Sequence, residues 1–408
     1  MMKRNKCMAK DLKHIPELRF PEFKNSGEWN KIALEDVLDY EQPTKYIVES
    51  DNYKEEGTPV LTANKSLILG YTEEIHNIYN TLPTIIFDDF TTDRKYIDFP
   101  FKVKSSAIKL LTVKDDKEDN LRFIFEAMQL IPFDAREHKR HYISEFQKQK
   151  INTPQNPAEQ KKIADCLSSL DDYINAMQEK IDLLQIYKKG FQQLLFATNQ
   201  SQCPTYRFSQ FKKDGKWREL KLTDTCELIR GPFGGSLKKE SFVKEGYAVY
   251  EQSHAIYGNM ESFRYHVSED KFKELKRFRV HSKDIIMSCS GTMGKFAIIP
   301  NNYKEGIINQ ALLKLSAKKG YDYRFIKQLL ELPKYQDEIL SGAAGGAIKN
   351  IASISQIKKI PIYIPNLEEQ IFIADFFASI DDLLTLAEKK LSKLKEYKKG
   401  LMQQLFYK

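Results

Sequence analysis

The sequence predicts an α+β protein built from two similar halves, with two long helices that pair as an antiparallel coiled coil. The first observation is an internal repeat. Residues 157–196 and 367–406 align at an offset of 210 without gaps, and 17 of 40 positions are identical. Average composition would give roughly two or three identities. Such a repeat predicts a pseudo-symmetric molecule that suits a two-part partner.

The second observation is a pattern of short strands and separate helices before each repeat. It divides the chain into a first globule at 1–156, a first helix at 157–197, a second globule at 198–366 and a second helix at 367–408. A chain of 408 residues is too long for one hydrophobic core, which agrees with this division.

The first globule begins with Arg19-Phe20 and Trp29, and short apolar runs predict strands at Thr84–Phe87 and Ala107–Val113. The apolar spacing that follows predicts a helix at Leu121–Ile131. Because the strands and the helix occupy separate stretches, the pattern is typical of an α+β domain.

The repeated segments carry a heptad pattern, with apolar residues at alternating steps of four and three. Each segment is preceded by prolines that favour a helix start, and each would span about 60 Å. Two core helices of separate bundles are the alternative interpretation. The seam residues are Ile163, Leu167, Leu170, Ile174, Met177, Ile181 and Leu184, and then Ile373, Phe377, Ile380, Leu384, Leu391 and Leu394.

The second globule repeats the opening of the first, with Arg207-Phe208 and Trp217. Strands are predicted at Ile285–Ser288, Phe296–Ile299 and Ala311–Leu315, and a helix at Tyr323–Leu332. Glycine-rich loops at 231–235, 291–294 and 342–346 interrupt this half.

Polar residues outside the seam are copied between the two helices, which predicts two equivalent outer surfaces for two copies of a partner protein. A solvated helix face is the alternative for the aspartates. The predicted docking residues are Glu159, Gln160, Asp171, Asp172, Glu369, Gln370, Asp381 and Asp382.

Composition favours an ordinary intracellular protein. The net charge of +8 is compatible with nucleic-acid binding. Five scattered cysteines form no C-x-x-C pair and indicate reduced thiols. No apolar run approaches 18 residues and no signal-peptide pattern follows Met1, so we expect a soluble, cytoplasmic protein with no membrane partner.

The arrangement resembles the specificity subunit of type I restriction–modification systems over nearly the whole chain. The firmest residues are the paired helix starts, Pro157 with Glu159-Gln160 and Pro365 with Glu369-Gln370. Each pair is followed by I-A-D, D-D and Y-K-K-G elements. The R-F-x-x-F-x-x-x-x-x-W openings, the Gly291–Lys295 loop and the Gly345-Gly346 loop extend the resemblance.

The resemblance implies that each globule is a target recognition domain reading one half of a bipartite site in double-stranded DNA. It implies that the helices act as a spacer on which two modification subunits dock. Those subunits would carry S-adenosylmethionine, and restriction subunits would add translocation and cleavage driven by ATP and Mg²⁺. The chain itself is then expected to catalyse nothing and to bind no cofactor.

DNA contact requires cations for phosphates and planar donors for base edges. Candidates in the first globule are Lys45, Tyr46, Asn64, Lys65, Arg94, Lys95, Tyr96, Lys139 and Arg140. Candidates in the second are Lys238, Lys239, Gln252, His254, Tyr257, Arg277, Arg279, Ser290, Thr292, Lys295 and Lys349.

No catalytic or metal motif emerges from the sequence. A phosphate loop would need Gly at 289 and Ser or Thr at 296, where Cys289 and Phe296 stand. Asp88, Asp89 and Asp93 form an acidic cluster that could hold Mg²⁺, although a capped loop is the alternative. A self-contained methyltransferase or nuclease, and a coiled-coil scaffold without a DNA role, remain as competing hypotheses.

Overall fold

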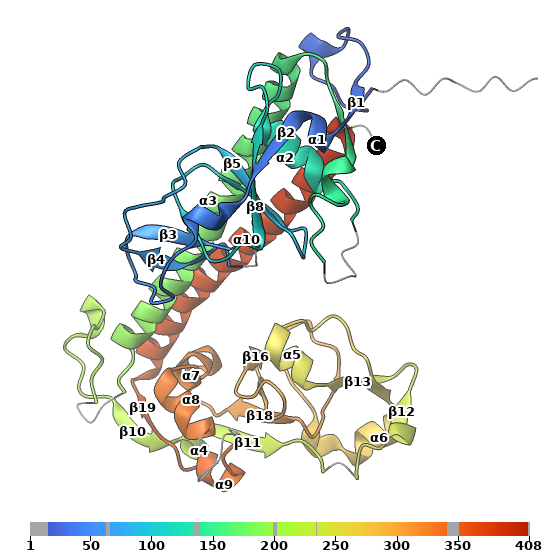
Figure 1. The fold of residues 1–408 in the computed structure, drawn as a ribbon. Helices are drawn as coiled ribbons and strands as arrows, with labels where there is room; N and C mark the ends of the chain where they lie inside the picture. Colours follow the sequence, from blue (N-terminus) through green and yellow to red (C-terminus); the bar gives the residue numbers. More distant parts are fainter. Residues whose placement is uncertain are drawn as a thin grey trace, which may run out of the picture. The chain divides into compact units, whose positions relative to one another are not determined.

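The computed structural model describes residues 15–62, 66–133, 139–198, 202–233, 235–340 and 351–406, and it forms two compact units (Figure 1). Unit 1 combines Met1–Gln178 with Lys389–Lys408, and unit 2 is Glu179–Glu388. The units do not follow the four predicted segments, because each takes one globule and part of both long helices. The predicted residues Asn64, Lys65 and Lys349 lie outside the described residues.

Unit 1 contains a four-stranded antiparallel sheet in the order β2-β8-β5-β6, a three-stranded sheet β4-β3-β7 and a two-stranded ribbon β1-β9. The strands are β1 Asn30–Ala33, β2 Leu38–Glu41, β3 Thr58–Leu61, β4 Ile68–Thr72, β5 Thr84–Asp88, β6 Arg94–Ile97, β7 Lys102–Val103, β8 Ile108–Val113 and β9 Lys150–Thr153. The helices of its globule are α1 Leu34–Val37 and α2 Leu121–Gln129.

Unit 2 repeats this plan, with sheets β11-β18-β15-β16 and β12-β14-β13-β17 and a ribbon β10-β19. Its strands are β10 Arg218–Lys221, β11 Cys226–Arg230, β12 Phe242–Val243, β13 Tyr247–Tyr250, β14 His266–Val267, β15 Ile285–Ser288, β16 Phe296–Ile298, β17 Gly306–Ile308, β18 Leu312–Ala317 and β19 Pro361–Ile364. Its helices are α4 Leu222–Thr225, α5 Gln252–Tyr257, α6 Glu269–Glu274, α7 Tyr323–Leu330, α8 Pro333–Leu340 and α9 Ile354–Ile357.

The duplicated topology confirms the predicted fold class of two similar α+β globules with two long helices. Each strand predicted from the sequence is present within two residues of its expected bounds, and so are helices α2 and α7. In both units one sheet contains a parallel strand pair, β3 with β7 in the three-stranded sheet of unit 1 and β13 with β17 in a four-stranded sheet of unit 2. The two halves therefore share even the less common features of their sheets.

The repeated segments form α3, Pro157–Leu195, and α10, Leu367–Leu405. Figure 1 shows α3 in green beside α10 in red. Within unit 1, Asp171 binds Lys398 and the ring of Tyr173 lies under Lys390. Within unit 2, Lys188 binds Asp381 and Phe191 packs edge-on against Phe376. Residue numbers rise on one helix as they fall on the other, so the pairing is antiparallel.

Each long helix is buried along one side and exposed along the other. All thirteen seam residues are buried or half-buried, whereas their neighbours at other heptad positions are mostly exposed. Each globule's core continues onto the helix ends. Trp29 packs on Phe123 and Phe406 in unit 1, and Trp217 packs on Phe325 and Phe196 in unit 2.

Candidate nucleic-acid interface

A buried clasp fastens the start of each globule to the start of its helix. Arg19 donates through Nε and Nη2 to both carboxylate oxygens of Glu159, at 2.7 Å each, and through Nη1 to the carbonyl of Gly27. Arg207 binds Glu369 in the same two-pronged way, at 2.8 and 2.6 Å. The repeated arginines and glutamates are therefore explained by one internal contact that occurs twice.

The glutamines beside these glutamates face the N-terminus of the neighbouring helix. Gln160 accepts from the backbone N–H of Asn120, the N-cap of α2, and Gln370 accepts from that of Asp322, the N-cap of α7. Glu159, Gln160, Glu369 and Gln370 are at most 2% exposed. The predicted outer surface is therefore wrong at these four positions, because their side chains hold each unit together.

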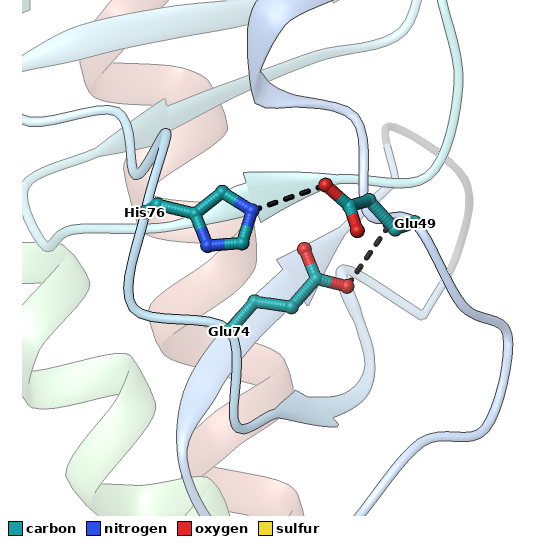
Figure 2. A group of neighbouring side chains, drawn as sticks. All are labelled: Glu49, Glu74 and His76. Carbon is teal, nitrogen blue, oxygen red and sulfur yellow. Dashed lines mark hydrogen bonds and ion pairs between the residues drawn. The ribbon is translucent and has the colours of Figure 1, made fainter.

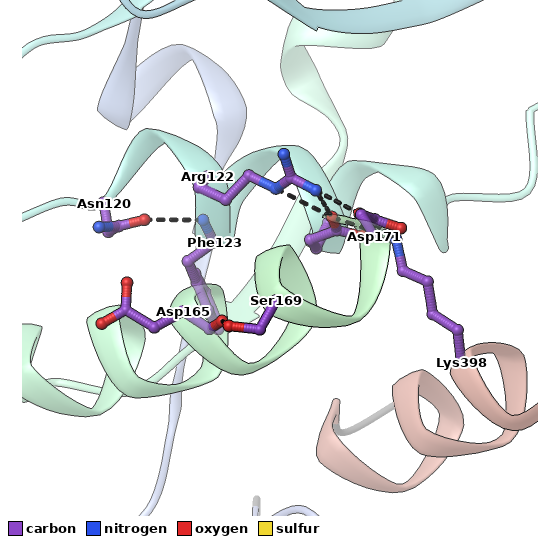
Figure 3. Close-up of polar contacts among 8 residues, drawn as sticks. Asn120, Arg122, Phe123, Asp165, Ser169, Asp171 and Lys398 are labelled. Atoms are coloured by element: carbon purple, nitrogen blue, oxygen red, sulfur yellow. Dashed lines mark hydrogen bonds and ion pairs between the residues drawn. The ribbon is translucent and has the colours of Figure 1, made fainter. Parts of the chain in front are cut away.

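A charged network joins α2 to the helix pair in unit 1 (Figure 3). Asp171 binds Lys398 across the seam, and it also binds Arg122, which in turn pairs with Glu126. In unit 2, Asp381 accepts from Lys188 and from Gln328 on α7. Lys188 and Lys398 fall at seam positions of the heptad pattern, and each pairs with the first aspartate of the D-D element on the other helix. Asp172 and Asp382, the second aspartates, are exposed.

The predicted DNA contacts of unit 1 are only partly free. Tyr46 is a buried core residue that packs on Tyr79, so the prediction is wrong there. Lys45 pairs with Glu41, and Lys139 pairs with Glu145. Three other predicted DNA-contact residues, Arg94, Lys95 and Tyr96, are half-buried on the edge strand β6. Arg140 is exposed.

Arg94 is the most constrained of these cations. Its guanidinium lies 5.1 Å from the ring centre of Phe146, and burial lowers its pKa to about 10. Tyr96 packs against Phe125, with the Arg122 guanidinium 4.9 Å from its ring centre. Arg140, in contrast to Arg94, is exposed.

The acidic cluster in unit 1 forms a capped loop. One carboxylate oxygen of Asp88 accepts from the backbone N–H groups of Phe90 and Thr91, at 2.9 and 2.8 Å. Asp89 is buried against the ammonium of Lys109 at 2.9 Å. Because both carboxylates already have donors, the loop alternative accounts for them better than a Mg²⁺ site.

A second group with metal-ligand chemistry was not apparent from the sequence. Figure 2 shows Glu49, Glu74 and His76 together, with a 3.0 Å contact between the His76 ring and Glu49. The buried ammonium of Lys102 pairs with Glu74. Burial alone would raise the pKa of Glu74, but the bonds from Lys102 and from backbone N–H groups lower it. The ammonium of Lys102 therefore already supplies the positive charge that a metal ion would bring to this cluster.

In unit 2, one predicted DNA-contact residue is buried, and several others are exposed to solvent. His254 is buried and its ring bonds to the backbone of Glu251 and Ser262, so it supports helix α5 and does not reach solvent. The exposed members of the predicted set are Lys238, Lys239, Tyr257, Arg277, Thr292 and Lys295.

A tight hairpin between β15 and β16 presents Thr292 and Lys295. The Ser288 hydroxyl donates to the carbonyl of Thr292 and accepts from the backbone N–H of Lys295. Gly294 has φ of +73°, and a Cβ there would lie 2.7 Å from the side-chain oxygen of Gln336. The positive φ favours glycine at this position, so Gly294 allows the tight turn that presents two exposed polar side chains.

Beside the hairpin lies a polar pocket of about 770 Å³ that joins three separate segments of unit 2. Its lining includes four predicted residues, Gln252, His254, Tyr257 and Ser290. Burial raises the pKa of the neighbouring Cys289 to about 11, so its thiol stays neutral and is a poor nucleophile. Sequence reasoning missed the other polar members, which are Glu251, Ser253, Asn259, Ser262, Arg264, Asn309 and Gln310.

Two α+β globules, each clasped to the start of a long helix, define a tandem-repeat protein. Residues 26–186 and 214–396 match the family model of the type I restriction modification DNA specificity domain. The chain belongs to this family. Among the described residues, no helix has the length and apolarity needed to cross a membrane.

Curated proteins similar to this chain are described as type I restriction enzyme specificity subunits. The EcoR124I/EcoR124II specificity subunit of Escherichia coli is 40% identical over 172 residues, covering 40% of this chain and 42% of that protein. The MjaVIII specificity subunit of Methanocaldococcus jannaschii is 23% identical, covering 97% of this chain and 95% of that protein. This chain thus aligns with less than half the length of the first relative and with nearly all of the second.

Solved structures share the fold. The S subunit of a type I restriction–modification system from M. genitalium has a TM-score of 0.64 at 17% identity, covering 96% of this chain and 99% of that one. A chain from a study of complex assembly in the type I system has a TM-score of 0.53 at 13% identity, covering 92% and 96%. At these identities the likeness establishes the fold.

Proposed function

We propose that this chain is the sequence-specific DNA-binding subunit of a type I restriction–modification complex. Each globule reads one half of a bipartite site in double-stranded DNA, and the helix pair fixes the spacing between the two readers. The observation that carries the proposal is the duplication of a whole recognition unit, clasp and seam included, within a chain of this family. The complex acts in the cytoplasm, where the DNA is.

Catalysis belongs to the partners in this proposal. Modification subunits bring S-adenosylmethionine, and restriction subunits bring ATP and Mg²⁺. The chain contributes recognition and assembly only. Methyl transfer or DNA cutting by the purified chain alone would instead favour the self-contained enzyme.

Adenine methylation, mapped in a host with and without this gene, tests recognition directly. Replacing residues 198–350 by another recognition domain should alter one half of the methylated motif and leave the other half and the modification activity unchanged. Sequencing of the methylated DNA measures both halves at once. A change in both halves would contradict modular reading, and the absence of any gene-dependent motif would favour a scaffold without a DNA role.

The helix pair also offers a docking surface, although not at the buried clasp. Heptad positions just after and just before the seam lie on opposite flanks. On one flank, Asp171 contacts α2 through Arg122 and Asp381 contacts α7 through Gln328. The other flank, here called the open flank, is solvent-exposed. It consists of Tyr173 and Tyr397 in unit 1 and of Leu383 and Tyr187 in unit 2.

We infer that each modification subunit docks on the open flank. Tyr187 and Tyr397 are copies of one another and are 58% and 62% exposed. Large exposed aromatics are the side chains that most often anchor protein interfaces. The same anchor in each unit accounts for two copies of one partner, and the exposed Asp172 and Asp382 remain available as polar neighbours.

Tyr187→Glu and Tyr397→Glu should each remove one modification subunit, and the double variant should remove both, because losing an aromatic anchor costs about 2 kcal/mol or more. Native mass spectrometry of co-expressed complexes would count the subunits. Gln185→Glu, an exposed change on α3 away from the open flank, is the control. Full assembly by the double variant would show that partners dock elsewhere.

A further inference from the structure

The polar pocket of unit 2 presents an ordered set of hydrogen-bond donors. It is formed where α5, the segment after β15 and the link between β17 and β18 meet. The backbone approaches closely here, since a Cβ at Gly231 would lie 1.8 Å from the carbonyl oxygen of Asn309. The glycine at 231 therefore allows the link that carries Asn309 to pack beside β11.

Two amide side chains in the pocket have fixed orientations. The Oδ1 atom of Asn309 accepts from the backbone N–H of Ala311 at 3.0 Å, and the Oε1 atom of Gln252 accepts from the Ser290 hydroxyl. Both oxygens are thus turned to the protein. In the described part of the chain, neither amide NH₂ group donates to a protein acceptor, so both remain available to a ligand.

Other lining residues add to this polarity. The exposed guanidinium of Arg264 brings further N–H donors and lies 4.8 Å from the ring centre of Tyr265. Tyr257, which is 80% exposed, offers a flat apolar face. The carboxylate of Glu251 is the pocket's acidic acceptor. The arrangement favours a flat ligand with adjacent acceptors and a neighbouring amino group.

A G·C pair matches this description in the major groove. Guanine presents two adjacent acceptors, N7 and O6, and its cytosine presents the N4 amino donor. Adenine would turn its N6 amino group toward the amide donors, and thymine offers a single acceptor, O4, beside a methyl group. Resting on the proposed function, we propose that unit 2 reads a guanine of its half-site through Asn309 and Gln252, with Arg264 assisting and Glu251 accepting from the paired cytosine.

Isosteric variants test the donors without disturbing the loop. Asn309→Asp keeps the oxygen that accepts from Ala311 but replaces the outward NH₂ by an acceptor, and Gln252→Glu does the same beside Ser290. In the full chain co-expressed with its modification partner, each variant should lose the guanine requirement at one position of the second half-site. Asn302→Asp is the control, because this exposed residue adds the same charge in the adjoining pocket.

Modified duplexes give a readout that requires no variant. 7-Deazaguanine removes the N7 acceptor, so one substituted guanine in the second half-site should weaken binding of the wild-type complex roughly tenfold. The same substitution should have little further effect on Asn309→Asp or Gln252→Glu. Titration of labelled duplexes at fixed salt measures the difference.

The outcomes separate the two proposals. A bipartite motif that depends on the gene, combined with unchanged guanine preference in both variants and no effect of 7-deazaguanine in the second half-site, would overturn the pocket assignment alone. The same holds if the half-site assigned to unit 2 by domain exchange contains no guanine. If no gene-dependent motif exists at all, the proposed function itself fails.

Discussion

Ile181→Asp is expected to unfold the helix pairing of unit 2 before the rest of the chain. Ile181 is a seam residue that is 3% exposed. The substitution removes a buried apolar side chain and forces a carboxylate out of water into the seam, which costs on the order of 4 kcal/mol. With a urea slope of about 2 kcal/mol/M, the midpoint of that unit should fall by about 2 M.

The chain allows each unit to be followed separately. Its two tryptophans are divided, with Trp29 in unit 1 and Trp217 in unit 2. In a Trp29→Phe background, Trp217 fluorescence reports the effect of Ile181→Asp. In a Trp217→Phe background, Trp29 reports the repeat-equivalent change Leu391→Asp in unit 1.

Gln185→Asp is the matched control for Ile181→Asp, since it adds the same carboxylate to an exposed position four residues away on α3. It should move the midpoint by less than about 0.3 M. Equal effects of Gln185→Asp and Ile181→Asp would mean that charge on the helix matters and burial at the seam does not. An unshifted Ile181→Asp midpoint would contradict the coiled coil.

Local patterns in the sequence were sufficient for the elements and for the seam. The heptad at Ile163–Leu184 and the short apolar runs at β5 and β15 carry their periodicity within a few residues, which is the range over which helix and strand geometry act. The pairing of Lys188 with Asp381 was not visible, because it joins residues 193 positions apart. Until that partner is known, the charge of Lys188 contradicts the apolar heptad pattern.

The role of the copied polar residues could not be predicted from the sequence, for a different reason. Duplication preserves Glu159 and Glu369 equally well whether they bind a partner protein or the chain's own Arg19 and Arg207. Distinguishing the two requires burial, which is a property of the folded unit. Tyr46 and His254 were misjudged for the same reason. The pocket could not be predicted either, since Gln252, Ser290 and Asn309 come from segments with no common pattern.

Removing one side of the clasp should be as damaging as a charge in the seam. The side chains of Glu369 and Arg207 are 1% and 12% exposed and share two short bonds, and this contact raises the pKa of Arg207. Glu369→Ala leaves the guanidinium largely buried without its carboxylate, which costs about 3–5 kcal/mol. The Trp29→Phe background again reports unit 2, and the indole N–H of Trp217 has no bond to the altered carboxylate.

The double variant Arg207→Met/Glu369→Leu distinguishes two free energies. One is the cost of leaving a buried charge without its partner, and the other is the net contribution of the ion pair to stability. A buried ion pair replaced on both sides by apolar groups is often nearly neutral. We therefore expect the double variant to unfold within about 1 kcal/mol of the parent chain, and Glu368→Ala, an exposed neighbour, to be neutral. If the losses of the single variants Arg207→Met and Glu369→Leu simply added in the double variant, the two side chains would not act as a unit. The Trp217 core alone would then hold the start of the globule on the helix.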